Sequence, residues 1–127
     1  MGNNSTKVDQ LLQQWEDSYK KGLLSFWILL RLHGRSSYAY EMTAMIADMS
    51  QGTVVADEKS IYRALKRFEE NGILQSRTQN SDMGPPRRYY SLTPLGQQLL
   101  ARFIERNIRI FAQPNVAAAI DSVTNGG

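Results

Sequence analysis

Six basic residues in the second half of the chain have the types and spacing that suit contact with a polyanion. Four recur at three- and four-residue intervals and two follow a pair of prolines: Lys59, Arg63, Lys66, Arg67, Arg87 and Arg88. Arginine can form two hydrogen bonds to a guanine edge, whereas lysine acts more as a point charge for phosphate or guanine. This chemistry permits a polyanionic partner such as DNA.

The charge is concentrated rather than large. The 127-residue chain has a formal net charge of +3 and a pI near 9.3. Residues 57–109 hold ten basic and six acidic residues, an excess of +4, so the rest is acidic by one. The alternative is an ordinary solvated helix face, on which the bases pair with Glu58 or Glu70.

Enzymatic and metal chemistry find little support in the composition. The chain has no cysteine and one histidine, His33, which excludes disulfides, thiol catalysis and cysteine-ligated metals. No nucleophile–base pair, paired carboxylates or phosphate-binding glycine loop is recognisable. We therefore expect neither an enzyme nor a cofactor.

Targeting signals are equally sparse. The polar start lacks the apolar region of a signal peptide. The most apolar stretch, residues 23–32, is about half the ~20 residues that a membrane-spanning helix needs. A cytoplasmic protein without a membrane partner is expected.

Apolar spacing predicts three helices in the first part of the chain. The first helix carries Val8, Leu11, Leu12, Trp15 and Tyr19. Gly22 either separates this helix from a central helix over residues 23–33 or forms a kink between the two. A third helix follows after a loop. Its core-facing side chains are expected to be Tyr40, Ala44, Met45 and Ala47 or Met49.

A helix, a β-hairpin and a last helix follow. Asp57 is the expected N-cap of a helix that runs to Asn71, with Ile61, Leu65 and Phe68 on its apolar face. Residues 73–78 and 87–92 predict two strands, with a turn over 80–86.

The last helix is expected to begin at Thr93-Pro94 and to end near Pro114. The element order predicts a mainly α fold with a small β-hairpin, the winged form of helix-turn-helix.

Three segments of the chain resemble the PadR-like family of winged-helix transcriptional regulators. They are Tyr-Ala-Tyr-Glu-Met at 38–42, the helix and its exit over 60–74, and Gly-Pro-Pro-Arg-Arg-Tyr-Tyr-Ser-Leu-Thr-Pro-Leu-Gly at 84–96. The resemblance implies a dimeric DNA-binding regulator, commonly a repressor. It also implies that the recognition helix and wing contact operator DNA and that the terminal helices form the dimer.

The chain departs from the family pattern at a few positions. Ala39 replaces the usual glycine, and Lys59 stands where glycine is frequent and adds a base at the start of the recognition helix. Some members release DNA when a small aromatic or hydrophobic molecule binds, so such a molecule is a candidate effector. The last helix lacks tryptophan, so the interfacial tryptophan pocket of some members is not carried over.

The predicted DNA-binding residues come from three elements: Tyr38, Lys59, Ser60, Tyr62, Arg63, Lys66, Arg67, Arg87 and Arg88. Arg63 either reads a base or forms a surface salt bridge. Tyr62 either binds phosphate or packs beside Phe68, and Tyr38 either binds phosphate or belongs to the core. One of Arg87 and Arg88 is expected to face DNA, because neighbouring strand residues point to opposite faces.

The last helix is apolar on more than one face, which favours a symmetric partner. The predicted dimer interface comprises Leu11, Leu12, Trp15, Leu100, Phe103, Ile104, Ile108 and Phe111. The alternative is that these helices fold back on their own domain. The predicted domains are a helix at 1–20, a winged helix at 21–93, a dimerisation helix at 94–113 and a flexible tail at 114–127. The alternative function is a winged-helix protein-interaction module that does not bind DNA.

Overall fold

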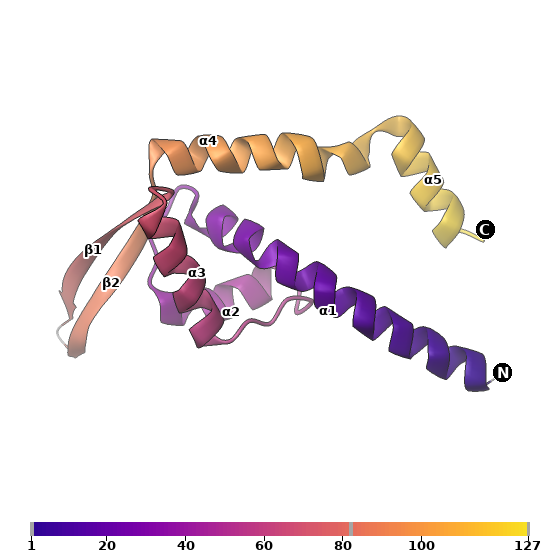
Figure 1. The fold of residues 1–127 in the computed structure, drawn as a ribbon, viewed down its shortest axis with the longest axis horizontal. Coiled ribbons are helices and arrows are strands. Elements are labelled where there is room, and N and C mark those ends of the chain that lie inside the picture. The colour runs from indigo at the N-terminus through magenta and orange to yellow at the C-terminus, as the bar shows by residue number, and fades with distance from the viewer. Residues whose placement is uncertain (1, 82, 127) are drawn as a thin grey trace.

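The computed structural model describes residues 2–81 and 83–126. The chain forms helices α1 (Gly2–Leu32), α2 (Ala39–Met49) and α3 (Glu58–Glu70), a hairpin of β1 (Leu74–Ser81) and β2 (Gly84–Leu92), and helix α4 (Pro94–Phe103). A π-helical turn at 104–108 and a 3-10 turn at 109–112 lead into α5 (Pro114–Thr124). The hairpin lies at one end of the molecule, and the start of α1 and the C-terminal segment extend at the other (Figure 1).

The core lies where the second half of α1 meets α2, α3, the hairpin and α4. Its largest fully buried side chains are Ile28, Leu32, Met42, Ile46, Ile61, Leu65 and Leu74. On α3 the predicted apolar face is confirmed, since Ile61, Leu65 and Phe68 are all buried. This packing fixes which side of α3 remains free for a ligand.

Helix α1 is continuous, so the predicted break at Gly22 is wrong, and the boundary drawn between residues 20 and 21 falls inside a helix. A glycine inside a helix is less favourable than alanine by only about 1 kcal/mol. The turns on either side offset that loss. A Cβ at Gly22 would meet no atom within 4 Å, so no close packing requires a glycine there.

Helix α2 uses a different face from the one predicted. Its buried residues are Ala39, Met42 and Ile46, whereas Tyr40 is 68% exposed and Met49 is 39% exposed. Apolar residues occur on both sides of this helix, so their spacing is equally compatible with either side as the buried face. The structure selects the face that places two branched or flexible side chains against α1 and α3.

The hairpin is longer than predicted, because residues 79–81 and 84–86 continue the strands. The register pairs Leu74 with Leu92 and Thr78 with Arg88, and it shifts between Gln79 and Ser81. The outer edge of β2 is bridged by Ser37, just before α2. The wing is thereby joined to the start of α2 as well as to α3.

Helix α4 begins as predicted. The Thr93 hydroxyl accepts from the Gly96 amide at 3.0 Å and donates to the Gly72 carbonyl at 2.6 Å, and Pro94 occupies the first turn. Gly96 lies so close to the Ile73 carbonyl that a Cβ would be 2.2 Å from its oxygen. The end of α1 is tied to the same helix by a 2.9 Å hydrogen bond between His33 and Gln97.

The C-terminal segment corrects the prediction of a flexible tail, because residues 114–124 form helix α5. Pro114 occupies the first turn of that helix, where its missing amide hydrogen is not needed, instead of ending the preceding one. None of the α5 residues is buried, and Ile120 and Val123 are 44% and 79% exposed.

Two negative findings concern the described residues. Among them, no helix is both long and apolar enough to span a membrane. Nor does the described part of the chain gather three or more histidine or acidic side chains into a possible metal site.

Candidate nucleic-acid interface

The first turn of α3 is organised by its N-cap. The Asp57 carboxylate accepts a 2.6 Å hydrogen bond from the Ser60 backbone amide. Hydrogen bonds from the Ser60 backbone and side chain lower the pKa of Asp57 below its ordinary value, with smaller help from the charges of Arg63 and Lys59. The predicted N-cap is confirmed, and Ser60 is engaged in it.

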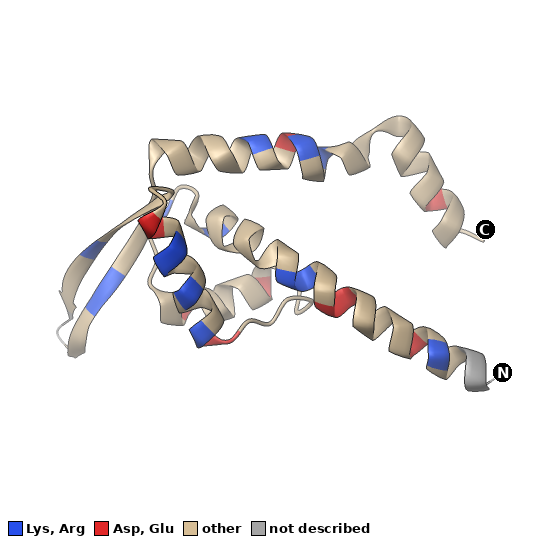
Figure 2. Ribbon diagram, viewed as in Figure 1, with Lys and Arg blue, Asp and Glu red and all other residues tan. Residues whose placement is uncertain are grey.

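Three basic side chains form a ridge along the solvent side of α3: Lys59, Arg63 and Lys66, here called the basic ridge. All three are exposed, and they lie opposite the buried face of Ile61 and Leu65. In the described part of the chain the ion pairs are Lys20 with Glu16 and Arg109 with Glu105. Among the described residues, the basic ridge therefore forms no ion pair within 4.0 Å of a carboxylate, although the charges of Lys59 and Arg63 act on Asp57. Both alternatives for Arg63 stay predictions. Figure 2 shows these basic positions along α3 and others on both strands of the hairpin.

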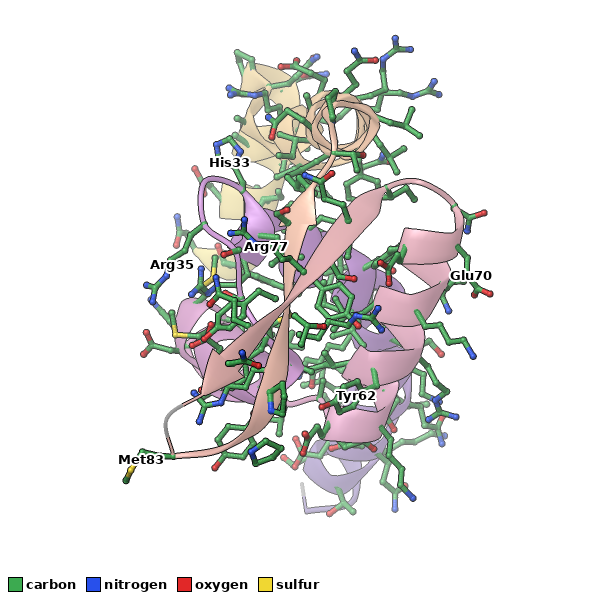
Figure 3. All side chains as sticks on the ribbon, turned by 90° about the vertical axis from the view of Figure 1, so that its left-hand side faces the viewer. His33, Arg35, Tyr62, Glu70, Arg77 and Met83 are labelled. Atoms are coloured by element: carbon green, nitrogen blue, oxygen red, sulfur yellow. The ribbon has the colours of Figure 1, made fainter. Side chains whose placement is uncertain are left out.

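The two flanks of α3 face different neighbours. Tyr62 is 51% exposed and lies on the flank nearest the hairpin, whereas Glu70 lies at the far end of the helix and points away (Figure 3). Ser60 is half-buried and lines a hollow with Asp17 and Lys20 of α1.

The Arg67 guanidinium lies 5.4 Å from the centre of the Phe68 ring. Arg67 therefore packs over the ring of its neighbour Phe68. The two alternatives for Tyr62, phosphate contact and packing beside Phe68, stay predictions.

The two wing arginines lie on opposite faces of β2, as the alternation predicts. Arg88 shares a face with the buried Tyr90. Burial raises the pKa of Tyr90, and both the charge of Arg88 and a hydrogen bond from it oppose that rise. Arg87 shares the other face with Tyr89, and its guanidinium lies 4.6 Å from the centre of the Tyr38 ring.

These elements enclose a cleft of about 380 Å³ between the start of α2, α3 and the tip of the wing. It brings together residues of three separate segments: Tyr38, Ala39, Tyr40, Tyr62, Met83, Gly84, Pro85, Pro86, Arg87 and Arg88. Four of the nine predicted DNA-binding residues line this cleft, and the basic ridge adjoins it on α3. Three tyrosines line the cleft, and the charged groups among its described lining residues are Arg87 and Arg88, which suit contact with a phosphate backbone.

Two further residues at or near this surface lie outside the predicted site. Tyr40, predicted for the core, is exposed and lines the cleft. Arg77, one of the ten basic residues of the segment 57–109, is also exposed. The register places it opposite Tyr89, on the same face of the hairpin as Arg87. Strand alternation combined with the hairpin register could have found Arg77, since paired residues share a face.

The predicted dimer residues divide into three groups. Leu11, Leu12, Trp15 and Phe111 are exposed, at 54%, 48%, 75% and 52%. Ile108 is half-buried, and Phe103 and Ile104 are half-buried against the protomer's own core, with Phe103 stacked on Phe26 at 5.8 Å. Leu100 is only 3% exposed and belongs to that core. Its assignment to the interface is therefore wrong, because Leu100 folds back on its own domain; Phe103 and Ile104 do so in part.

The chain matches one family over most of the winged-helix region. Residues 28–102 match the sequence model of the transcriptional regulator PadR-like family. A curated relative from Lysinibacillus sphaericus, an uncharacterized protein, is 24% identical over 85 residues, which are 67% of this chain and 78% of that protein.

Solved structures agree with this match. A PadR-like transcription factor from Bacteroides fragilis is 28% identical, with a TM-score of 0.58 over 71% of this chain and 84% of that chain. Bacillus subtilis PadR, solved in complex with operator DNA, is 25% identical, with a TM-score of 0.62 over 67% of this chain and 48% of that one. The aligned part thus spans about half of the Bacillus subtilis protein.

One further structure covers nearly the whole fold. A PadR family transcriptional regulator from Eggerthella lenta has a TM-score of 0.71 over 96% of this chain and 99% of that chain, at 20% identity. The likeness therefore includes the terminal helices. Together these matches confirm the predicted winged-helix fold and the predicted class, a transcriptional regulator rather than an enzyme.

Proposed function

We propose that this chain, which belongs to the transcriptional regulator PadR-like family, acts in the cytoplasm as a homodimeric repressor on a pseudo-palindromic operator. The observation that carries the proposal is the basic ridge, three exposed cations on one helix without an ion-pair partner in the described part of the chain. A helix of this kind fits the major groove, where Arg63 would read a base and Lys59 and Lys66 would contact phosphate or guanine.

The wing extends this surface. Arg87 and Arg88 are exposed beside the cleft, and Bacillus subtilis PadR, solved with operator DNA, supports DNA as the partner. A hairpin next to a recognition helix reaches the neighbouring backbone. Tyr38 and Tyr62, which line the same cleft, would lie beside that backbone.

The terminal helices favour a second copy of the chain as partner. Between residues 8 and 19 of α1, five large apolar side chains are exposed: Val8, Leu11, Leu12, Trp15 and Tyr19. The C-terminal segment exposes Ile110, Phe111 and Ile120 in the same way. An isologous dimer would bury both sets at once and would place two recognition helices on half-sites about one helical turn, ~34 Å, apart.

A small aromatic or hydrophobic effector would find its best place between α1 and α4. An apolar pocket of about 140 Å³ lies there, lined by Gly22, Ser25, Phe26, Leu29, Phe68, Leu99, Leu100 and Phe103. Its size is close to that of an engineered apolar cavity that binds benzene, roughly 150 Å³. A ligand in this pocket would change DNA binding if it bound one arrangement of α1 and α4 more tightly than another.

The test is the affinity for the DNA upstream of the chain's own gene, measured by fluorescence anisotropy at several salt concentrations. Arg63→Ala should weaken binding by about 1–3 kcal/mol per half-site and relax base preference at one position. Lys66→Ala should weaken binding to all sequences and lower the salt slope by about one per half-site. Arg102→Ala on α4 removes a charge elsewhere and is the matched control.

Two outcomes would contradict the proposal. If both ridge variants bind as tightly as the wild type while the wild type binds specifically, the surface is wrongly assigned. If the wild type binds weakly and without steep salt dependence, the alternative of a protein-interaction module is favoured, because counterion release accompanies every phosphate contact.

A further inference from the structure

The start of α2 is attached to the wing by backbone hydrogen bonds. The Ser37 amide donates to the Tyr90 carbonyl at 3.1 Å, and the Tyr90 amide donates to the Ser37 carbonyl at 2.8 Å. Ser37 is fully buried at this bridge. The bridge fixes the next residue, Tyr38, beside the face of β2 that carries Arg87 and Tyr89.

The Tyr38 ring contacts both of those side chains. The Arg87 guanidinium lies 4.6 Å from the ring centre, within the range of a cation–π interaction. The Tyr89 ring meets the Tyr38 ring edge-on, with centres 5.3 Å apart and an interplanar angle of 67°. Tyr38 is thus held by the strand while it holds the arginine.

Among the side-chain hydrogen bonds of the described part of the chain, none uses the Arg87 guanidinium. A guanidinium that lies over a ring still presents its N–H groups at its edge. No carboxylate forms an ion pair with Arg87 among the described residues. The side chain is therefore restricted before a ligand arrives, and less rotamer entropy remains to be lost on binding.

We propose that Tyr38 is a positioning residue that holds Arg87 over its ring, so that the wing presents a preorganised cation to a DNA phosphate. This proposal rests on the proposed function, because it requires the wing to face DNA. It also separates the two wing arginines: Arg87 is held by α2, whereas Arg88 lies on the opposite face with Tyr90. The ring of Tyr38, rather than its hydroxyl, is the essential part.

A double-mutant cycle on DNA affinity tests the positioning role. Tyr38→Leu should weaken operator binding by about two- to fivefold per wing, the range of an exposed cation–π contact, whereas Tyr38→Phe should bind like the wild type. In the Arg87→Ala background, Tyr38→Leu should have no further effect. Tyr38→Phe, which keeps the ring and removes only the hydroxyl, is the matched control.

Each departure from this pattern overturns the inference. If Tyr38→Phe loses as much affinity as Tyr38→Leu, the hydroxyl contacts phosphate directly and the ring does not position Arg87. If Tyr38→Leu weakens binding equally in the presence and absence of Arg87, its role is structural. If Arg87→Ala leaves both affinity and salt slope unchanged, Arg87 is not the wing contact.

A measurement without DNA distinguishes failure of this inference from failure of the proposed function. In NMR spectra of the free protein, the Arg87 side-chain protons should be shifted upfield by the ring current of residue 38 in the wild type and in Tyr38→Phe. They should return to ordinary positions in Tyr38→Leu. Unshifted protons in the wild type would refute the positioning even if the protein binds DNA. The expected shifts in a protein that binds no DNA would leave the contact real and refute its role in DNA binding.

Discussion

Replacing Gly96 with alanine should destabilise the fold, because the residue lies at the joint between the hairpin and α4. An added Cβ would be 2.2 Å from the Ile73 carbonyl oxygen, 3.2 Å from the carbonyl carbon and 3.2 Å from Leu92. The carbonyl cannot move away freely, since it accepts a hydrogen bond from the Thr93 amide at 3.1 Å.

The magnitude follows from this geometry. Overpacking ordinarily costs about 1–3 kcal/mol, and a clash with hydrogen-bonded backbone belongs at the upper end, about 3 kcal/mol. For a chain of this size that corresponds to a fall in Tm of roughly 10 °C. Gly22→Ala is the contrasting control, because its Cβ meets no atom within 4 Å and alanine favours the helix by up to about 1 kcal/mol.

The assay is thermal unfolding followed by circular dichroism. All proteins must be compared at one concentration, because association makes Tm depend on concentration. The reasoning predicts that Gly96→Ala melts well below the wild type and that Gly22→Ala melts at or above it. A Gly96→Ala protein that melts at or above the wild-type temperature would refute the close approach of α4 to Ile73.

Three further predictions concern the core, the dimer and the effect of acid. Leu100→Ala should lower the free energy of unfolding by about 2–5 kcal/mol, as a buried leucine does; a loss under 1 kcal/mol in denaturant titration would place Leu100 outside the core. Trp15→Ala should weaken association in sedimentation experiments by at least about 2 kcal/mol with the fold intact, and an unchanged dimer constant would exclude α1 from the interface. The pKa of Asp57 in the folded protein is lower than its ordinary value of 3.8. The charged carboxylate therefore stabilises the fold at pH values above 3.8, and this contribution is lost as the pH falls through the lower, folded-state pKa. Asp57→Asn should therefore lose less stability over that acid range than the wild type, and equal losses in acid unfolding curves would contradict the capping role.

Local signals sufficed for the recognition helix and its surroundings. Asp57 before an amphipathic segment, the hairpin and the Thr93-Pro94 start all depend on interactions within a few residues, and the structure has each of them. The same holds for the opposite orientation of Arg87 and Arg88, which follows from strand periodicity alone.

The sequence predictions fail where tertiary packing, and not the local sequence, determines the structure. Gly22 has a lower helix propensity than its neighbours, but the long helix α1 continues through it. A proline such as Pro114 can follow the end of one helix or occupy the first turn of another, and only the structure shows that α5 begins there. The contact between Tyr38 and Arg87 joins residues far apart in sequence, so no local pattern could reveal it.

The prolines of the wing have a consequence for the protein's behaviour in concentrated solution. An extended hairpin exposes unpaired backbone donors and acceptors, which can recruit the strand of another molecule and start aggregation. Pro85 and Pro86 lie in β2 beyond the Ser37 bridge, and neither has an amide hydrogen to offer a foreign strand. Arg87, the next residue along the same strand, carries a charge that disfavours pairing with another strand. The outer edge of β2 is therefore a poor template for the growth of a larger sheet.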